Sequence, residues 1–125
     1  MQSFLIVDDE KAMCELYKRI LKKNYDCVVF TAEDGDEAED MIDKINTAID
    51  VVISDINHPG KNGLDLARDI HKKYPKIQIF LISGNLSDGR KEKAEKLIKT
   101  GVIKGLLEKP FNEIALKSMI KLSGL

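Results

Sequence analysis

The stretch Phe4-Leu5-Ile6-Val7-Asp8-Asp9-Glu10 joins a short apolar run directly to three carboxylates, and this junction decides the fold. Four further apolar runs follow along the chain, at residues 27–30, 51–53, 77–82 and 105–107. The runs are rich in β-branched residues and alternate little with polar ones, which is typical of strands buried on both faces of a parallel sheet. We therefore expect residues 4–7 to form the first of five such strands.

Between these runs, apolar residues recur at the three- and four-residue spacing of a helix face. The five apolar stripes are Met13, Leu16, Tyr17, Ile20 and Leu21; Ala38, Met41, Ile42 and Ile45; Leu64, Ala67 and Ile70; Ala94, Leu97 and Ile98; and Ile114, Ala115, Met119 and Leu122. Alternating strands and helices predict right-handed crossovers and a parallel sheet with helices on both faces. The expected fold class is α/β, a doubly wound (βα)5 unit with five parallel strands.

The composition is that of an ordinary soluble domain, and 125 residues suit a single one. The longest apolar runs span four to six residues, far short of the roughly 20 needed to cross a bilayer. No secretory leader is recognisable at the N-terminus, so we expect a cytoplasmic protein without membrane contact. The two cysteines, Cys14 and Cys27, lack a metal-binding spacing and are expected to be small buried thiols.

Charge is distributed unevenly along the chain. Residues 1–60 carry a net charge of −8, and residues 61–125 carry +7. This division predicts an electrostatic dipole rather than the uniformly basic surface of a nucleic-acid-binding protein. We therefore expect no direct contact with nucleic acid.

Polar side chains stand at the carboxyl ends of four predicted strands: Asp8 and Asp9, Asp55, Ser83, and Lys109. Parallel strands place these ends at one edge of the sheet, where such folds bind ligands. Carboxylates with room for water suit Mg²⁺, and one of them can attack phosphorus as a nucleophile. A cation, an ammonium group and a hydroxyl would stabilise the transferring phosphoryl group.

Four motifs carry these residues in order: Val7-Asp8-Asp9-Glu10, Ser54-Asp55-Ile56-Asn57-His58-Pro59-Gly60-Lys61-Asn62-Gly63, Ile82-Ser83-Gly84 and Glu108-Lys109-Pro110-Phe111. With these motifs the chain resembles the receiver domains of response regulators over its whole length. The resemblance implies one receiver domain over residues 1–125, with the flavodoxin-like strand order 2-1-3-4-5 and Gly63 opening the third helix.

The resemblance also implies roles for the motif residues. Asp55 would accept a phosphoryl group and bind Mg²⁺ together with Asp8, Asp9 and the backbone carbonyl of Asn57, with Mn²⁺ as a possible replacement. Lys109 would pair with the phosphoryl group, and the Lys109-Pro110 peptide bond would be cis.

Ser83 and Leu106 occupy the positions from which the family transmits phosphorylation. Ser83 would contact the phosphoryl oxygens and move toward them. Leu106 stands where the family often carries an aromatic residue, so the switch would be muted or differently built. The segment from Ser83 to Lys109 is a few residues longer than usual, and the surplus is expected at residues 84–90 and 101–103.

The resemblance implies signalling partners rather than an enzyme substrate, with only self-phosphorylation and its reversal as chemistry. A histidine kinase or a phosphotransfer protein would donate the phosphoryl group to a monomer or weak dimer. Output would pass through the face of the fourth helix, fifth strand and fifth helix. Basic residues expected on or beside this face are Arg90, Lys91, Lys93, Lys96, Lys99, Lys104, Lys117 and Lys121.

Alternatives remain open at this point. The chain could be a pseudo-receiver that acts as a constitutive protein-interaction module, or a metal-dependent phosphatase on a similar sheet. His58 lies three residues after Asp55 and is expected to be an exposed loop residue, with a metal or relay role as the weaker alternative. His71 is expected on the surface of the third helix.

Overall fold

The computed structural model describes residues 1–45, 48–58, 60–84 and 89–124. Its strands and helices alternate along the chain. They are β1 (Gln2–Val7), α1 (Lys11–Asn24), β2 (Cys27–Ala32), α2 (Gly35–Ile45), β3 (Val51–Asp55), α3 (Gly63–Lys73), β4 (Gln78–Ser83), α4 (Arg90–Lys99), β5 (Gly105–Glu108), α5 (Glu113–Ile120) and a 3₁₀ turn, η2 (Lys121–Ser123). Each predicted apolar run lies in a strand apart from Ile77, which precedes β4.

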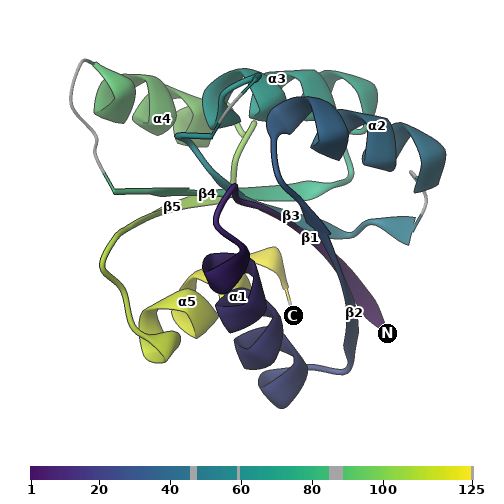
Figure 1. The fold of residues 1–125 in the computed structure, drawn as a ribbon. Coiled ribbons are helices and arrows are strands. Elements are labelled where there is room, and N and C mark those ends of the chain that lie inside the picture. The colour runs from purple at the N-terminus through teal and green to yellow at the C-terminus, as the bar shows by residue number, and fades with distance from the viewer. Residues whose placement is uncertain (46–47, 59, 85–88, 125) are drawn as a thin grey trace.

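All neighbouring strands are parallel, in the order β2-β1-β3-β4-β5, which confirms the predicted topology. Helices α1 and α5 cover one face of the sheet, and α2, α3 and α4 cover the other (Figure 1). β3 lies in the middle and is buried along its whole length. Its last residue, Asp55, pairs in register with Ile82 of β4, so the Asp55 carboxylate is carried by a strand that is buried throughout.

Alternate residues of the central strands face two separate apolar clusters. Leu5, Val7 and Val52 pack toward α2, α3 and α4. Phe4, Ile6 and Ile53 pack toward α1 and α5. Because both faces are covered, the strands show the continuous apolar runs that the sequence displays.

The helix stripes were predicted correctly in α2 and α3 but only in part elsewhere. Leu16 of α1, Ile98 of α4, Ile114 of α5 and Leu122 of η2 belong to the predicted stripes, yet they are exposed. The residues of α5 that enter the core are Leu116, Met119 and Ile120. The helical spacing of α5 was ambiguous because apolar residues surround most of this short helix, and only docking onto the sheet selects its buried face.

No helix in the described part of the chain combines the length and apolarity that a membrane span requires. The cysteines do not form a disulfide. Cys14 is buried as expected, whereas Cys27 is only half-buried because it lies at the start of the edge strand β2.

The start of α3 is held close to the end of β3. Asn62 caps the helix by accepting a hydrogen bond from the backbone N–H of Asp65 at 3.0 Å. Gly63 is the first residue of α3, as predicted, and its N–H donates to the carbonyl of Ile56. A Cβ atom at Gly63 would lie 2.7 Å from the carbonyl oxygen of Asp55, so this turn has no room for a side chain.

We expect Gly63→Ala to lower the free energy of unfolding by about 1–3 kcal/mol, because the added methyl group would collide with backbone atoms of β3 and the following residue. Alanine otherwise stabilises a helix relative to glycine, so the sign of the effect is diagnostic. The measurement is urea unfolding followed by circular dichroism. Gly84→Ala is the control, since its Cβ would make only an ordinary contact with Lys109 at 3.7 Å. Equal free energies of unfolding for the two variants would show that a side chain at position 63 does not collide with the backbone of β3.

Candidate functional site

Asp55 ends β3 at the carboxyl edge of the sheet, and only 8% of its surface is exposed. Its Oδ2 atom accepts a hydrogen bond from the Lys109 ammonium group at 2.8 Å. Its Oδ1 atom accepts one from the backbone N–H of Asn57 at 3.0 Å. The carboxylate is therefore oriented by one donor from the loop after β3 and one from the loop after β5.

Asp8 follows β1 and is almost fully buried. Its Oδ1 atom accepts a hydrogen bond from the backbone N–H of Glu10 at 2.9 Å. Its Oδ2 atom lies 3.9 Å from the Lys109 ammonium group and has no hydrogen-bond partner among the described residues. Burial raises the pKa of Asp8, and the neighbouring charge of Asp55 raises it further, against the opposing effects of Glu10 N–H and Lys109.

Lys109 is the cation between these two carboxylates. Burial alone would lower its pKa, but the hydrogen bond to Asp55 and the charges of Asp55 and Asp8 raise the pKa above its ordinary value. Lys109 therefore stays charged at neutral pH. It brings the ammonium group to the place where an anionic group attached to Asp55 would lie.

Ser83 and Lys109 are held at the same edge by the pairing of β4 with β5. Ser83 is buried at the end of β4. The backbone N–H of Lys109 donates to the carbonyl of Ser83 at 2.8 Å. The Lys109-Pro110 peptide bond is cis, as predicted.

The two remaining predicted metal-binding residues, Asp9 and Asn57, are exposed beside this pocket. Among the described residues, no three His, Cys, Asp or Glu side chains are arranged so that they could hold a metal ion. Mg²⁺ nevertheless fits the donor set that is present. It is commonly bound through one or two carboxylates and keeps several waters, and the buried Oδ2 of Asp8 has no hydrogen-bond donor in the part of the chain that the structure describes.

His58 is buried rather than exposed, which corrects the expectation from sequence. Its Nε2 atom lies 3.0 Å from the hydroxyl of Ser54, and the same hydroxyl donates to the carbonyl of Asp55 at 2.9 Å. Ser54 lies within β3, where a buried hydroxyl needs a hydrogen-bond partner. The imidazole therefore helps fasten the loop after β3 to the strand. Ser54, the polar residue that directly follows the apolar run 51–53, is the signal in the sequence for this contact.

A second anchor of the same loop is Lys61, which forms ion pairs with Glu39 of α2 at 2.9 Å and with Asp69 of α3. The hydrogen bonds to Asp69 and then to Glu39 raise the pKa of Lys61. The loop that carries Asn57 is thus tied to β3, α2 and α3.

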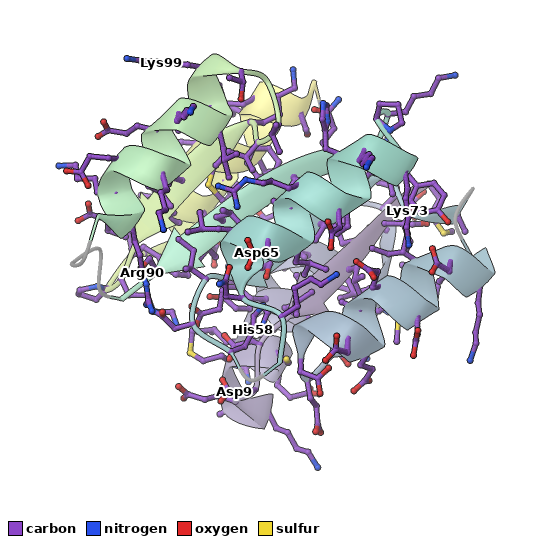
Figure 2. The ribbon with its side chains drawn as sticks, turned by 90° about the horizontal axis from the view of Figure 1, so that it is seen from above. Asp9, His58, Asp65, Lys73, Arg90 and Lys99 are labelled. Atoms are coloured by element: carbon purple, nitrogen blue, oxygen red, sulfur yellow. The ribbon has the colours of Figure 1, made fainter. Side chains whose placement is uncertain are left out.

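Arg90 also reaches the site loop, which the sequence did not predict. Its Nη1 atom donates a hydrogen bond to the side-chain oxygen of Asn57. Figure 2 shows Arg90 at the end of α4 nearer Asp9 and His58, with Lys99 at the opposite end. Arg90 was grouped with the basic residues of the fourth helix, but its side chain belongs to the edge that holds Asp55.

Ser83 and Leu106, the predicted transmission residues, are both described, whereas part of the loop between them is not. Leu106 is half-buried and packs on the apolar cluster beneath α2, α3 and α4. Of the predicted loop surplus, residues 85–88 lie outside the described residues. The turn at 101–103 is tied down by hydrogen bonds from the N–H groups of Val102 and Ile103 to the carbonyl of Leu97.

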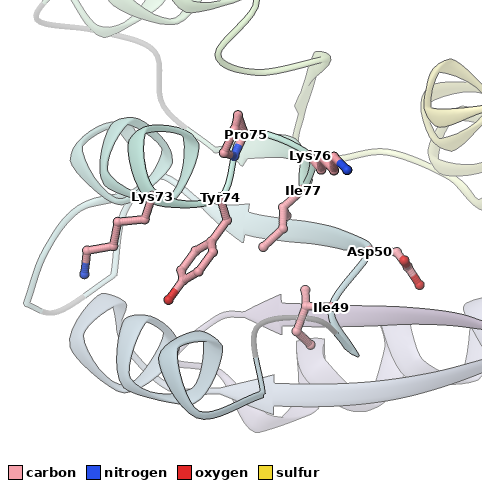
Figure 3. A pocket seen from close by; sticks show the side chains of 7 residues that line it. All are labelled: Ile49, Asp50, Lys73, Tyr74, Pro75, Lys76 and Ile77. Carbon is pink, nitrogen blue, oxygen red and sulfur yellow. The ribbon is translucent and has the colours of Figure 1, made fainter.

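A pocket lies away from this site, between the C-terminal end of α3 and the beginnings of β3 and β4 (Figure 3). Ile49, Tyr74 and Ile77 contribute its apolar wall. The Tyr74 hydroxyl donates to Asp43 of α2 at 2.7 Å. Because the pocket lies at the opposite edge of the sheet from Asp55, it takes no direct part in chemistry at that carboxylate.

Comparison with known proteins agrees with this geometry. The family model of the response regulator receiver domain matches residues 4–121. A chemotaxis protein CheY homologue of Campylobacter jejuni is 33% identical over 119 residues, covering 94% of this chain and 88% of that protein. The transcriptional regulatory protein DegU of Brevibacillus brevis is 36% identical over 80 residues, which are 63% of this chain but only 33% of DegU.

Solved structures show the same fold. A response regulator receiver domain protein from Clostridium thermocellum superposes with a TM-score of 0.86 at 27% identity, covering 98% of this chain and 94% of that one. The chemotaxis protein CheY4 of Vibrio cholerae superposes with a TM-score of 0.81 at 28% identity, covering 97% of each chain. The chain therefore belongs to the response regulator receiver family, whose members are signalling modules of two-component systems.

Because burial raises the pKa of Asp8 above its ordinary value of 3.8, its ionised form opposes folding. This cost is absent well below pH 3.8, grows as the pH rises from 3.8 to the raised pKa of the folded state, and persists in full at neutral pH. We therefore expect Asp8→Asn to raise the thermal midpoint at pH 7 by about 2–5 °C in chelator-containing buffer.

The measurement is thermal unfolding by circular dichroism, with the exposed Asp9→Asn as the control variant. The advantage of Asp8→Asn should vanish as the pH is lowered to about 3.8, because the wild-type carboxyl group is then largely protonated. A variant no more stable than wild type at pH 7 would contradict an unfavourable buried charge.

Proposed function

We propose that residues 1–125 act as a phospho-accepting receiver domain, in which Asp55 takes a phosphoryl group from a phosphohistidine in a His-Asp phosphorelay. The supporting observation is the Asp55 carboxylate at the end of β3, held 2.8 Å from Lys109 and beside the unpartnered oxygen of Asp8. A nucleophile, a fixed cation and a second carboxylate suit phosphoryl transfer, which depends mainly on positioning and charge.

In the proposed reaction, a carboxylate oxygen of Asp55 attacks phosphorus in line with the leaving nitrogen of the phosphohistidine. A P–O bond forms and the P–N bond breaks, and the leaving imidazole keeps the electron pair and takes up a proton. Lys109 is already charged and hydrogen-bonded to Asp55, so its ammonium group can pair with the phosphoryl oxygens without moving far. Hydrolysis of the acyl phosphate returns Asp55 to a carboxylate and resets the domain.

Mg²⁺, with Mn²⁺ as a replacement, would be held by Asp8, Asp9, Asp55 and the backbone carbonyl of Asn57. When bound, it would neutralise the negative charge that carboxylates and phosphoryl oxygens bring together. The unpartnered Oδ2 of Asp8 supports this assignment, because an oxygen of that kind is stabilised by a cation.

The phosphoryl group, with a charge of about −1.5 to −2, would then favour a second conformation of the domain. Ser83 is buried beside the Lys109 backbone and would donate its hydroxyl to the new oxygens. Leu106 lies two residues before Glu108, the register partner of Ser83, and would carry the change to the face of α4, β5 and α5. An output protein would bind there.

Incubation with acetyl phosphate and Mg²⁺ should add the mass of one phosphoryl group, and intact-mass spectrometry should detect it. Asp55→Asn should remain unmodified because an amide cannot serve as the nucleophile. Asp65→Asn, which removes an exposed carboxylate of α3, is the matched control and should be modified like the wild type.

Added phosphoryl mass that persists in Asp55→Asn would reject Asp55 as the acceptor. A wild-type protein that gains no mass and binds no Mg²⁺ would reject the proposal and favour a constitutive interaction module instead.

A further inference from the structure

Arg90 is linked to Asp55, the proposed phosphoryl acceptor, through a single intervening residue, Asn57. Its guanidinium donates to the side-chain oxygen of Asn57, while the backbone N–H of the same asparagine donates to Asp55 Oδ1 at 3.0 Å. A single asparagine therefore connects the guanidinium of α4 to the carboxylate of β3. The contact joins two elements that are 33 positions apart in the sequence.

Among the residues that the structure describes, Arg90 forms no ion pair with a carboxylate, and its guanidinium is hydrogen-bonded to the neutral side-chain amide of Asn57. The other two cations at this edge differ, because Lys61 is paired with Glu39 and Asp69 and Lys109 is paired with Asp55.

The position of Arg90 in its helix is also electrostatically unfavourable. It is the first residue of α4, preceded by Gly89, which provides no side-chain cap. A cation at a helix N-terminus is destabilising because the helix dipole is positive there. The negative charge of Asp55, which is hydrogen-bonded to the same asparagine, opposes this cost, and an additional anion on Asp55 would oppose it more strongly.

We propose that Arg90 is a phosphoryl-pairing residue, which holds its guanidinium at the rim of the site through Asn57 and binds the anionic group that Asp55 acquires. This inference rests on the proposed function and adds to it a residue that the motifs do not contain. The planar guanidinium can donate two parallel hydrogen bonds to phosphoryl oxygens, whereas Lys109 offers a point charge.

The same contact could instead serve only to position the loop that carries Asn57. The two roles predict different effects of losing Arg90 on Mg²⁺ affinity and on anion affinity. If Arg90 only positions the loop of Asn57, its loss should weaken Mg²⁺ binding and anion binding together. If Arg90 acts through its charge, its loss should weaken anion binding but leave Mg²⁺ binding unchanged or tighter, because a cation near the metal site has been removed.

The test uses beryllofluoride, a phosphoryl mimic, with the full chain. Fluorine NMR would measure beryllofluoride affinity at saturating Mg²⁺, and calorimetry would measure Mg²⁺ affinity alone. We expect Arg90→Met to weaken beryllofluoride binding by roughly three- to tenfold, without weakening Mg²⁺ binding. The beryllofluoride affinity of Arg90→Lys should fall between those of Arg90→Met and wild type, since lysine keeps the charge but cannot donate two parallel hydrogen bonds.

Lys91→Met is the matched control, because Lys91 is the next cation of α4 and is exposed. The proposal is overturned if Arg90→Met binds beryllofluoride as tightly as Lys91→Met does. It is equally overturned if Arg90→Met loses affinity for Mg²⁺ and beryllofluoride in parallel. A wild-type protein that binds no beryllofluoride with Mg²⁺ would reject the proposed function itself, and this inference with it.

Discussion

The ammonium group of Lys109 lies between two carboxylates of the site, 2.8 Å from Asp55 and 3.9 Å from Asp8. These carboxylates end two adjacent strands in the middle of the sheet, and both are buried. Without a cation between them, two negative charges would face each other in a buried environment and repel. The fold therefore depends on a lysine supplied from beyond β5 to keep a pair of buried carboxylates compatible with a compact core.

This arrangement makes the site receptive to added charge. Asp8 retains a raised pKa and an oxygen with no hydrogen-bond donor in the described part of the chain. The carboxylates therefore favour a cation, while Lys109 and the rim arginine favour an anion on Asp55. His58 and Lys61 anchor the loop that carries Asn57. Asn57 lies between the Asp55 carboxylate and the Arg90 guanidinium and is hydrogen-bonded to both.

Much of the site could be predicted because a parallel sheet places the ends of its strands at one edge. The residues Asp8, Asp55, Ser83 and Lys109 follow apolar runs in the sequence, and the structure brings them to that edge. The environment of His58 could not be predicted, since its burial depends on a hydroxyl of β3 that requires a partner. The contact of Arg90 with Asn57 could not be predicted either, because it joins the start of α4 to a loop that is distant in the sequence.

The α/β alternation, the strand positions and the side chains available at each strand end could be predicted from the sequence, because they follow from local periodicity and from the residues that end each run. Which polar groups meet depends on the folded structure. Folding selects the buried face of α5, buries Asp8 while Asp9 stays exposed, and turns Arg90 toward Asn57. Such contacts depend on how helices dock against the sheet, and docking is decided by packing across distant segments rather than by any local pattern.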